Sequence, residues 1–113
     1  MTEQVSEVYS YSQELVDDEN EILYCTNLFK ALGDGNRQKI LYLLRDGEKC
    51  VSDLLPYFEV LQPTVSTHLL ILEEVGILKV RRRGRRRMYS IADPHLYEIL
   101  DGFIDEMKDY IDL

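Results

Sequence analysis

The sequence predicts a mainly α-helical domain with one small β-hairpin, in the order α-α-α-α-β-β-α. Over most of the chain, apolar residues recur every three to four positions, which is the spacing of an amphipathic helix. Between residues 78 and 91, apolar and basic residues alternate instead, as they do in a β-strand. The length of 113 residues and the apolar content of 45% suit one domain with a modest core.

The first two helices are predicted on either side of Gly33-Asp34-Gly35. The earlier helix covers about residues 18–32, and its apolar positions are Ile22, Leu23, Leu28, Phe29 and Leu32. Glycine commonly ends a helix, and Asp34 is a suitable N-cap for the next one. The second helix has its apolar face at Ile40, Leu41, Leu43 and Leu44, and Asp46-Gly47 closes it.

The third and fourth helices follow after a short interval. A short helix is expected around Val51–Phe58, and Pro56 should kink or shorten it because proline cannot donate the helical hydrogen bond. The next helix covers Gln62–Val75, with Pro63 in the first turn, where proline is favoured. Its apolar face consists of Val65, Leu69, Leu72 and Val75, and Gly76 ends it.

Two strands and a last helix complete the predicted order. Gly84 separates the two alternating segments and can supply the positive φ that a tight hairpin turn needs. From Pro94 onward the helical spacing returns, which predicts a long amphipathic helix. Its apolar positions are Leu96, Ile99, Leu100, Phe103, Ile104, Met107 and Ile111.

The charges are distributed very unevenly along the chain. The net charge is −8, yet residues 77–91 carry seven basic residues and no acidic one. Because salt screens charges beyond about 8 Å, a polyanion responds to this local segment more than to the net charge. Residues 1–17 are polar and acidic with little periodicity, so we expect a disordered arm there and a domain over residues 18–113.

Two short helices followed by a two-stranded hairpin are the pattern of a winged helix-turn-helix domain. In such a domain the second helix contacts base edges in the major groove, while a basic hairpin beside it contacts phosphates or the minor groove. The candidate DNA contacts are Gln62, Thr64, Ser66, Thr67 and His68 in the fourth helix, and Arg81, Arg82, Arg83, Arg85, Arg86 and Arg87 in the hairpin. The expected partner is double-stranded DNA, bound with a strong salt dependence.

Each of these features has a second interpretation. The arginine run could be a solubilising hairpin or a localisation tag, although its place directly after a helix-turn-helix favours a DNA contact. His68 could form a hydrogen bond within the fold. The hydroxyl groups could cap their helix, although one cap does not need three of them.

The chain resembles the ArsR/SmtB family of metal- and stress-responsive repressors over about residues 22–110. The resemblance is carried by Ala31-Leu32-Gly33-Asp34 with Arg37, by Ile40-Leu41 and Leu43-Leu44, by Cys50-Val51-Ser52-Asp53-Leu54, by Gln62-Pro63-Thr64-Val65-Ser66-Thr67-His68-Leu69, and by Leu72-Glu73 and Gly76-Ile77-Leu78. It implies a homodimer formed through the first and last helices, binding to an operator, and release when an effector binds.

Four positions depart from the pattern of the family. Glu59 replaces a turn glycine, Leu61 replaces a capping serine, and Leu70 and Glu74 replace basic residues of many relatives. A recognition helix without a basic residue should bind DNA weakly by itself. We therefore expect the arginine-rich hairpin to supply the missing contacts, for example by entering the minor groove, where narrow A-tracts attract arginine.

Two kinds of effector site are candidates. Metal sensors of the family often carry a Cys-x-Cys pair in the third helix, but here the pair is Cys50-x-Ser52, and a hydroxyl does not replace a thiolate for a soft metal. A soft-metal site would need Cys25 to supply the missing ligand. A redox or persulfide role would need Cys25 and Cys50 close together, or one of them exposed as a reactive thiolate. The alternative is that both cysteines are small buried apolar residues.

The second candidate is a divalent metal site, for zinc for example, on the last helix. Zinc sensors of the family carry ligands there with a spacing that resembles Asp93, His95, Glu106 and Asp109. His95 and Glu106 are about 16 Å apart on one helix, at 1.5 Å per residue, so one ion would need ligands from two antiparallel chains of a dimer. The alternative is a solvated acidic face beside the dimer core.

Other classes of protein are less consistent with the sequence. No plausible nucleophile, base and acid set or glycine-rich phosphate loop suggests an enzyme. No apolar run is long enough to span a bilayer, and no signal peptide is evident, so the expected location is the cytoplasm. A winged-helix interaction protein and a constitutive DNA-binding regulator without an effector remain alternatives.

Overall fold

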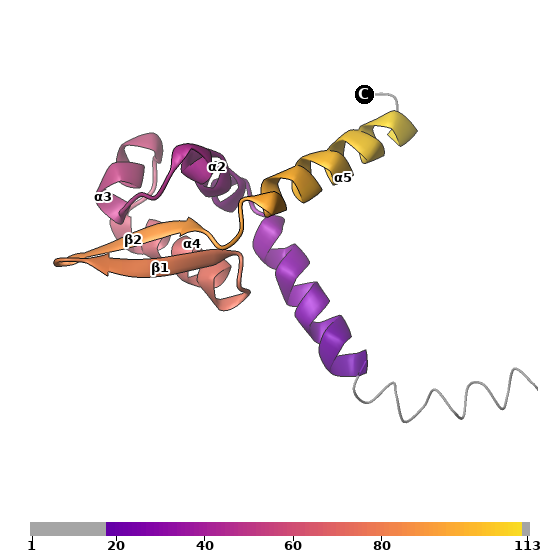
Figure 1. Cartoon of the computed structure of the whole chain (residues 1–113), viewed down its shortest axis with the longest axis horizontal. Coiled ribbons are helices and arrows are strands. Elements are labelled where there is room, and N and C mark those ends of the chain that lie inside the picture. The colour runs from indigo at the N-terminus through magenta and orange to yellow at the C-terminus, as the bar shows by residue number, and fades with distance from the viewer. Residues whose placement is uncertain (1–17, 112–113) are drawn as a thin grey trace, which may run out of the picture.

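The computed structural model describes residues 18–111, and the predicted order of elements is confirmed (Figure 1). The predicted arm, residues 1–17, lies outside the described residues, as do residues 112–113. The elements are a first helix over residues 18–32, α2 (Gly35–Leu43), α3 (Val51–Leu54), α4 (Gln62–Glu74), β1 (Leu78–Arg83), β2 (Arg86–Ile91) and α5 (His95–Ile111).

Local sequence signals explain the boundaries of the helices. Asp34 caps α2, because its carboxylate accepts a hydrogen bond of 3.1 Å from the backbone N–H of Arg37. Pro56 shortens the third helix as predicted: α3 has four residues and passes into a 3-10 turn over Leu55–Tyr57. Gly76 follows the end of α4 with φ +86°, a conformation that side chains rarely adopt.

The hairpin is antiparallel, and its register runs from Leu78 opposite Ile91 to Arg83 opposite Arg86. Gly84 turns the chain with φ +65°, as the sequence predicts. The structure adds a contact that the sequence did not predict, in which Lys49 pairs with Tyr89 through two backbone hydrogen bonds of 2.8 and 2.9 Å. This bridge ties the segment before α3 to the outer edge of β2.

The core lies between α2, α3, α4 and the inner face of the hairpin. Its fully buried side chains are Ile40, Leu44, Leu54, Val65, Leu69 and Leu72. Three of these lie on one face of α4, so the opposite face of that helix is turned outward. Leu78, Tyr89 and Ile91 cover the other side of the core.

The first helix and α5 both project from this body, toward the lower right and the upper right of Figure 1. The start of α5 is well anchored: the Tyr97 hydroxyl donates to the Leu41 carbonyl at 2.7 Å, and Arg45 binds both oxygens of Asp101 at 2.7 and 3.0 Å. The projecting parts instead expose large apolar side chains. These are Ile22, Leu23, Tyr24, Phe29, Ile99, Phe103, Ile104, Met107, Tyr110 and Ile111.

Candidate nucleic-acid interface

The predicted base-contacting residues of α4 do not share one environment. Gln62, Thr64 and Thr67 are exposed at the start of the helix. The Thr67 hydroxyl donates to the Pro63 carbonyl at 2.9 Å, which leaves its oxygen free to accept a hydrogen bond. Ser66 is half-buried and lines a cavity next to the hairpin. Base contacts by these residues stay a prediction. The three exposed residues, Gln62, Thr64 and Thr67, are the best placed to make them.

His68 is bound within the fold, which was the second interpretation of this residue. Its side chain is only 12% exposed, and its Nδ1 lies 3.0 Å from Nη1 of Arg37 and 3.9 Å from a carboxylate oxygen of Asp34. Because a guanidinium only donates, the imidazole accepts at Nδ1 and carries its proton at Nε2. His68 therefore positions α4 against α2, and a base contact through it stays a prediction.

Two of the six hairpin arginines are held by carboxylates. Arg81 forms a two-pronged ion pair with Glu48, and Nη2 of Arg87 lies 3.6 Å from the carboxylate of Glu73. The Arg81 guanidinium holds the pKa of Glu48 below its ordinary value, and the pair raises the pKa of Arg81 in turn. These arginines orient the hairpin on the helical body, and they are less available to a phosphate than the other four.

The other four arginines are Arg82, Arg83, Arg85 and Arg86, which surround the turn. None of them forms an ion pair within residues 18–111. The register also places like charges opposite each other, because Arg82 faces Arg87 and Arg83 faces Arg86. Directly opposed like charges destabilise a hairpin. A polyanion would remove this repulsion, so the tip is suited to bind one.

Sequence reasoning missed the carboxylates that hold the hairpin and the role of Arg37. Glu73 lies on α4 and Glu48 in the segment before α3, so neither is close in sequence to the arginine it binds. No local spacing signals these pairs, since they depend on how the hairpin packs. Arg37 was recognised as part of a motif, but its bond to His68 spans 31 residues.

Cys50 is buried and has a structural role at the start of α3. Its backbone N–H and its thiol both donate to the carboxylate of Asp53, at 3.0 and 3.2 Å. The backbone donor is the larger cause of a lowered pKa at Asp53. This environment matches the interpretation of Cys50 as a buried structural residue, and a sensing role stays a prediction.

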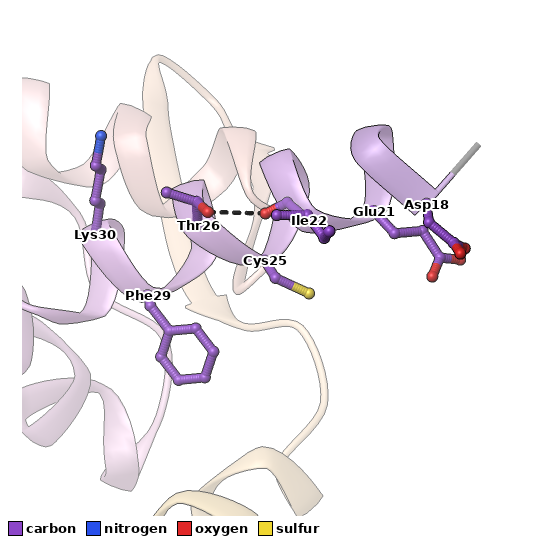
Figure 2. A pocket seen from close by; sticks show the side chains of 7 residues that line it. All are labelled: Asp18, Glu21, Ile22, Cys25, Thr26, Phe29 and Lys30. Atoms are coloured by element: carbon purple, nitrogen blue, oxygen red, sulfur yellow. Dashed lines mark hydrogen bonds between the residues drawn. The ribbon is translucent and has the colours of Figure 1, made fainter. Parts of the chain in front are cut away.

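Cys25 lies on an exposed face of the first helix, in a shallow hollow with Ile22 and Phe29 (Figure 2). All the residues that line this hollow come from that one helix, so it is an open surface. In the single chain Cys25 is therefore exposed, in contrast to the expected buried apolar residue. Cys25 and Cys50 line separate hollows that share no residue, and in the single chain they do not form a common thiol site.

The predicted metal ligands do not gather in one chain. Within residues 18–111, no group of three or more histidine, cysteine, aspartate or glutamate side chains could hold a metal ion. Nδ1 of His95 lies 3.0 Å from the carboxylate of Glu98, and the Asp93 carboxylate accepts from the His95 backbone N–H. A site that combines His95 of one chain with Glu106 and Asp109 of another stays a prediction.

The fold and the basic hairpin together define a winged helix-turn-helix protein of the kind that binds DNA. Residues 34–80 match the model of the arsR family of bacterial regulatory proteins. The chain is 41% identical to an uncharacterized HTH-type transcriptional regulator of Methanocaldococcus jannaschii, over 71% of this chain and 90% of that protein. The chain belongs to the ArsR family of transcriptional regulators.

Two further comparisons agree with this assignment. The transcriptional repressor SdpR of Bacillus subtilis is 37% identical, over 70% of this chain and 88% of that protein. A solution structure from Mycobacterium bovis, of a homodimeric winged helix-turn-helix DNA-binding domain, superposes with a TM-score of 0.69 at 30% identity. The superposition covers 78% of this chain and 84% of that one. In the part of the chain that is described, no helix could cross a membrane.

Proposed function

We propose that this protein is a dimeric repressor that binds an operator through α4 and the hairpin and leaves it when an effector binds. The observation that carries the proposal is the set of four arginines without an ion pair within residues 18–111, at the tip of a hairpin that follows α4 directly. A helix and a basic hairpin so connected can contact neighbouring grooves of one duplex. The repressor activity is supported by family membership and by relatives such as SdpR.

The absence of basic residues in α4 assigns different tasks to the two parts of the interface. The exposed first turn offers an amide and hydroxyl groups, which suit base edges but add no charge. The hairpin adds the positive charge and therefore most of the affinity. Arg83 precedes the turn and Arg85 lies within it, so both are well placed to enter a narrow minor groove.

A homodimer is supported by the apolar faces of the two projecting helices. Between the first helix and α5 lies an apolar groove of about 240 Å³, lined by residues such as Leu28, Phe29, Ile99 and Phe103. Phe29 and Phe103 are more than half exposed in the single chain. Exposed apolar patches of this kind mark protein interfaces. A second copy of this chain is the proposed partner, as in the homodimeric domain from M. bovis.

The remaining parts of the proposal concern the effector, the location and the activity. Family membership supports release by an effector, for which a metal ion bound between two chains or a thiol oxidant are the candidates. A regulator acts where its operator DNA lies, so the proposed location is the cytoplasm. No enzymatic activity is assigned to it.

The experiment that tests the proposal is a titration of reduced, metal-free protein into labelled DNA from upstream of its own gene, followed by fluorescence anisotropy. A scrambled duplex of the same composition is the control. A specific regulator should prefer the upstream duplex by about 10³-fold or more at near-physiological salt. Equal and weak binding to both duplexes would contradict the proposal. Metal ions and oxidants added to the specific complex then test release.

A further inference from the structure

A positively charged cavity of about 460 Å³ lies between the hairpin and the helix-turn-helix. Ser52 of α3 and Ser66 and Glu73 of α4 line one part of it. Arg85, Arg86 and Arg87 line the other part, from the turn and from β2. The cavity therefore exists only where all three parts of the winged helix-turn-helix meet.

The charges of this lining do not balance. Three arginines line the cavity with one acidic residue, Glu73, whose carboxylate lies 3.6 Å from Nη2 of Arg87. The remaining lining residues are uncharged: Cys50, Val51, Leu70 and Tyr89 beside the two serines. Arg85 and Arg86 have no such partner within residues 18–111. The hydroxyl groups of Ser52 and Ser66 add two neutral donors. Guanidinium and hydroxyl donors around one space are suited to an oxyanion such as a phosphate group.

The position of the cavity indicates where such a phosphate group comes from. If α4 occupies a major groove and the hairpin occupies the next minor groove, the DNA strand that separates the grooves must cross between them. The cavity lies in that gap, and Arg85 and Arg86 belong to the proposed DNA-binding tip as well. We propose that the cavity binds one backbone phosphate of this strand, through Arg86 and the hydroxyl of Ser66. This inference rests on the proposed function, since it names a contact of the same interface.

The proposal predicts that Ser66 and Arg86 act on the same group, which a double-mutant cycle can detect. The variants are Ser66→Ala, Arg86→Gln and both together, measured by anisotropy on the upstream and the scrambled duplexes. Each single variant should lower the affinity about tenfold, as expected for a lost bond to a charged group. The affinity of the double variant should be no more than about threefold below that of the single variant that binds more weakly. Once one of the two side chains has been replaced, the shared phosphate contact is already lost, so the second replacement removes little more.

Arg83→Gln is the matched control, because Arg83 faces Arg86 across the hairpin but does not line the cavity. In the double variant of Arg83→Gln and Ser66→Ala, the fold-loss of DNA affinity should equal the product of the two single losses. The cycle is repeated on the thermal unfolding of the free protein, where Ser66→Ala and Arg86→Gln should be additive. The proposal would be overturned if Ser66→Ala and Arg86→Gln were coupled in the thermal unfolding of the free protein. It would also be overturned if their losses of DNA affinity multiplied in the double variant.

The two duplexes separate this inference from the proposed function. A phosphate contact does not depend on base sequence, so the coupling should be equal on both duplexes. If wild type bound both duplexes equally, sequence-specific regulation would be refuted, but the coupling between Ser66 and Arg86 could still be observed. A titration of inorganic phosphate into DNA-free protein tests whether the cavity binds a free anion. The NMR amide signals of Ser52, Ser66 and Arg86 report the binding. Saturation below about 1 mM with no coupling on DNA would assign the cavity to a small anion and overturn the DNA contact.

Discussion

The Arg37 guanidinium joins the end of the first helix to His68 on α4. Its Nε and Nη2 donate to the carbonyls of Ala31 and Lys30 at 2.6 and 3.1 Å, and its Nη1 lies 3.0 Å from Nδ1 of His68. The two carbonyls belong to the last turn of the first helix, where carbonyl groups have no partner within their own helix. One side chain thus stabilises that helix end and positions the DNA-facing helix against it.

The first prediction concerns this linkage. Arg37→Ala should lower the free energy of unfolding by about 2 kcal/mol, because it leaves the Ala31 carbonyl and a largely buried imidazole without their donor and weakens the binding of the Lys30 carbonyl, which keeps only the Gly33 N–H. The free energy of unfolding of Arg37→Lys should lie between those of wild type and Arg37→Ala. A lysine ammonium group keeps the charge but not the planar set of donors of a guanidinium. Urea denaturation followed by circular dichroism measures both. Equal stability of Arg37→Ala and wild type would show that the linkage is unimportant.

The second prediction concerns the hairpin arginines. Replacing Arg83, Arg85 and Arg86 together by glutamine should abolish measurable DNA binding at near-physiological salt, because these three groups carry no carboxylate partner within residues 18–111. Each lost phosphate contact should also flatten the plot of log affinity against log salt by about 0.9. Single variants measured between low and moderate salt give that slope.

Arg81→Gln is the control for these variants, because Arg81 is already paired with Glu48. It should flatten the salt dependence less than Arg83→Gln does, although both remove one positive charge from the same strand. Identical slopes for the two variants would mean that the ion pair between Arg81 and Glu48 opens on DNA. The ion pairs of the free chain would then not indicate which arginines contact phosphates.

Local signals were sufficient to predict the fold from the sequence. Asp34, Gly76 and Gly84 act through their own backbone or through a neighbour three residues away, and all three do in the structure what the sequence predicts. The shortening of α3 by Pro56 is equally local. Such features depend on chain geometry within a turn, which a single sequence contains completely.

The candidate site was less predictable, because its contacts join distant parts of the chain. The arginine run predicted the basic hairpin, but the sequence did not show that Glu48 and Glu73 engage two of the six arginines. The pair of Arg81 and Glu48 depends on the bridge between Lys49 and Tyr89, which no periodicity signals. The environment of His68 likewise depends on how α2 crosses α4.

The third prediction concerns pH. Partners hold the pKa values of five carboxyl groups below their ordinary values: the backbone N–H of Arg37 for Asp34, Lys49 for Asp46, Arg81 for Glu48, the backbone N–H of Cys50 for Asp53, and Arg45 for Asp101. A carboxyl group whose pKa is lower in the folded state stabilises the fold above its unfolded pKa. That contribution is lost as the pH falls through the folded pKa.

The melting temperature should therefore change little from neutral pH to about pH 5, and should fall below about pH 4, where carboxyl groups begin to protonate. Asp101→Asn removes one of the five groups and should make the acid decline shallower, while lowering stability at neutral pH. Thermal scans between pH 3 and pH 8 measure both effects. A decline that begins near pH 6 would contradict the prediction, because these carboxyl groups are still ionised there.

The last prediction concerns the dimer. Phe103 lines the apolar groove between the first helix and α5 and is 57% exposed in the single chain. Phe103→Asp would place a charge in the proposed interface, where burying it is costly. We expect this variant to sediment as a monomer at micromolar concentrations at which wild type is a dimer. Tyr42→Asp on α2 is the control, because Tyr42 is 71% exposed but lies outside both projecting helices.

The same two variants connect the dimer to DNA binding. A dimer places two copies of α4 on one duplex, one helical turn or a multiple apart, so it gains affinity from both half-sites. A monomer keeps its hairpin and its exposed helix but contacts one half-site only. Phe103→Asp should therefore bind the upstream duplex at least about 100-fold more weakly than Tyr42→Asp. If Phe103→Asp is monomeric and still binds like wild type, one chain reads the operator alone, and the apolar faces serve another purpose.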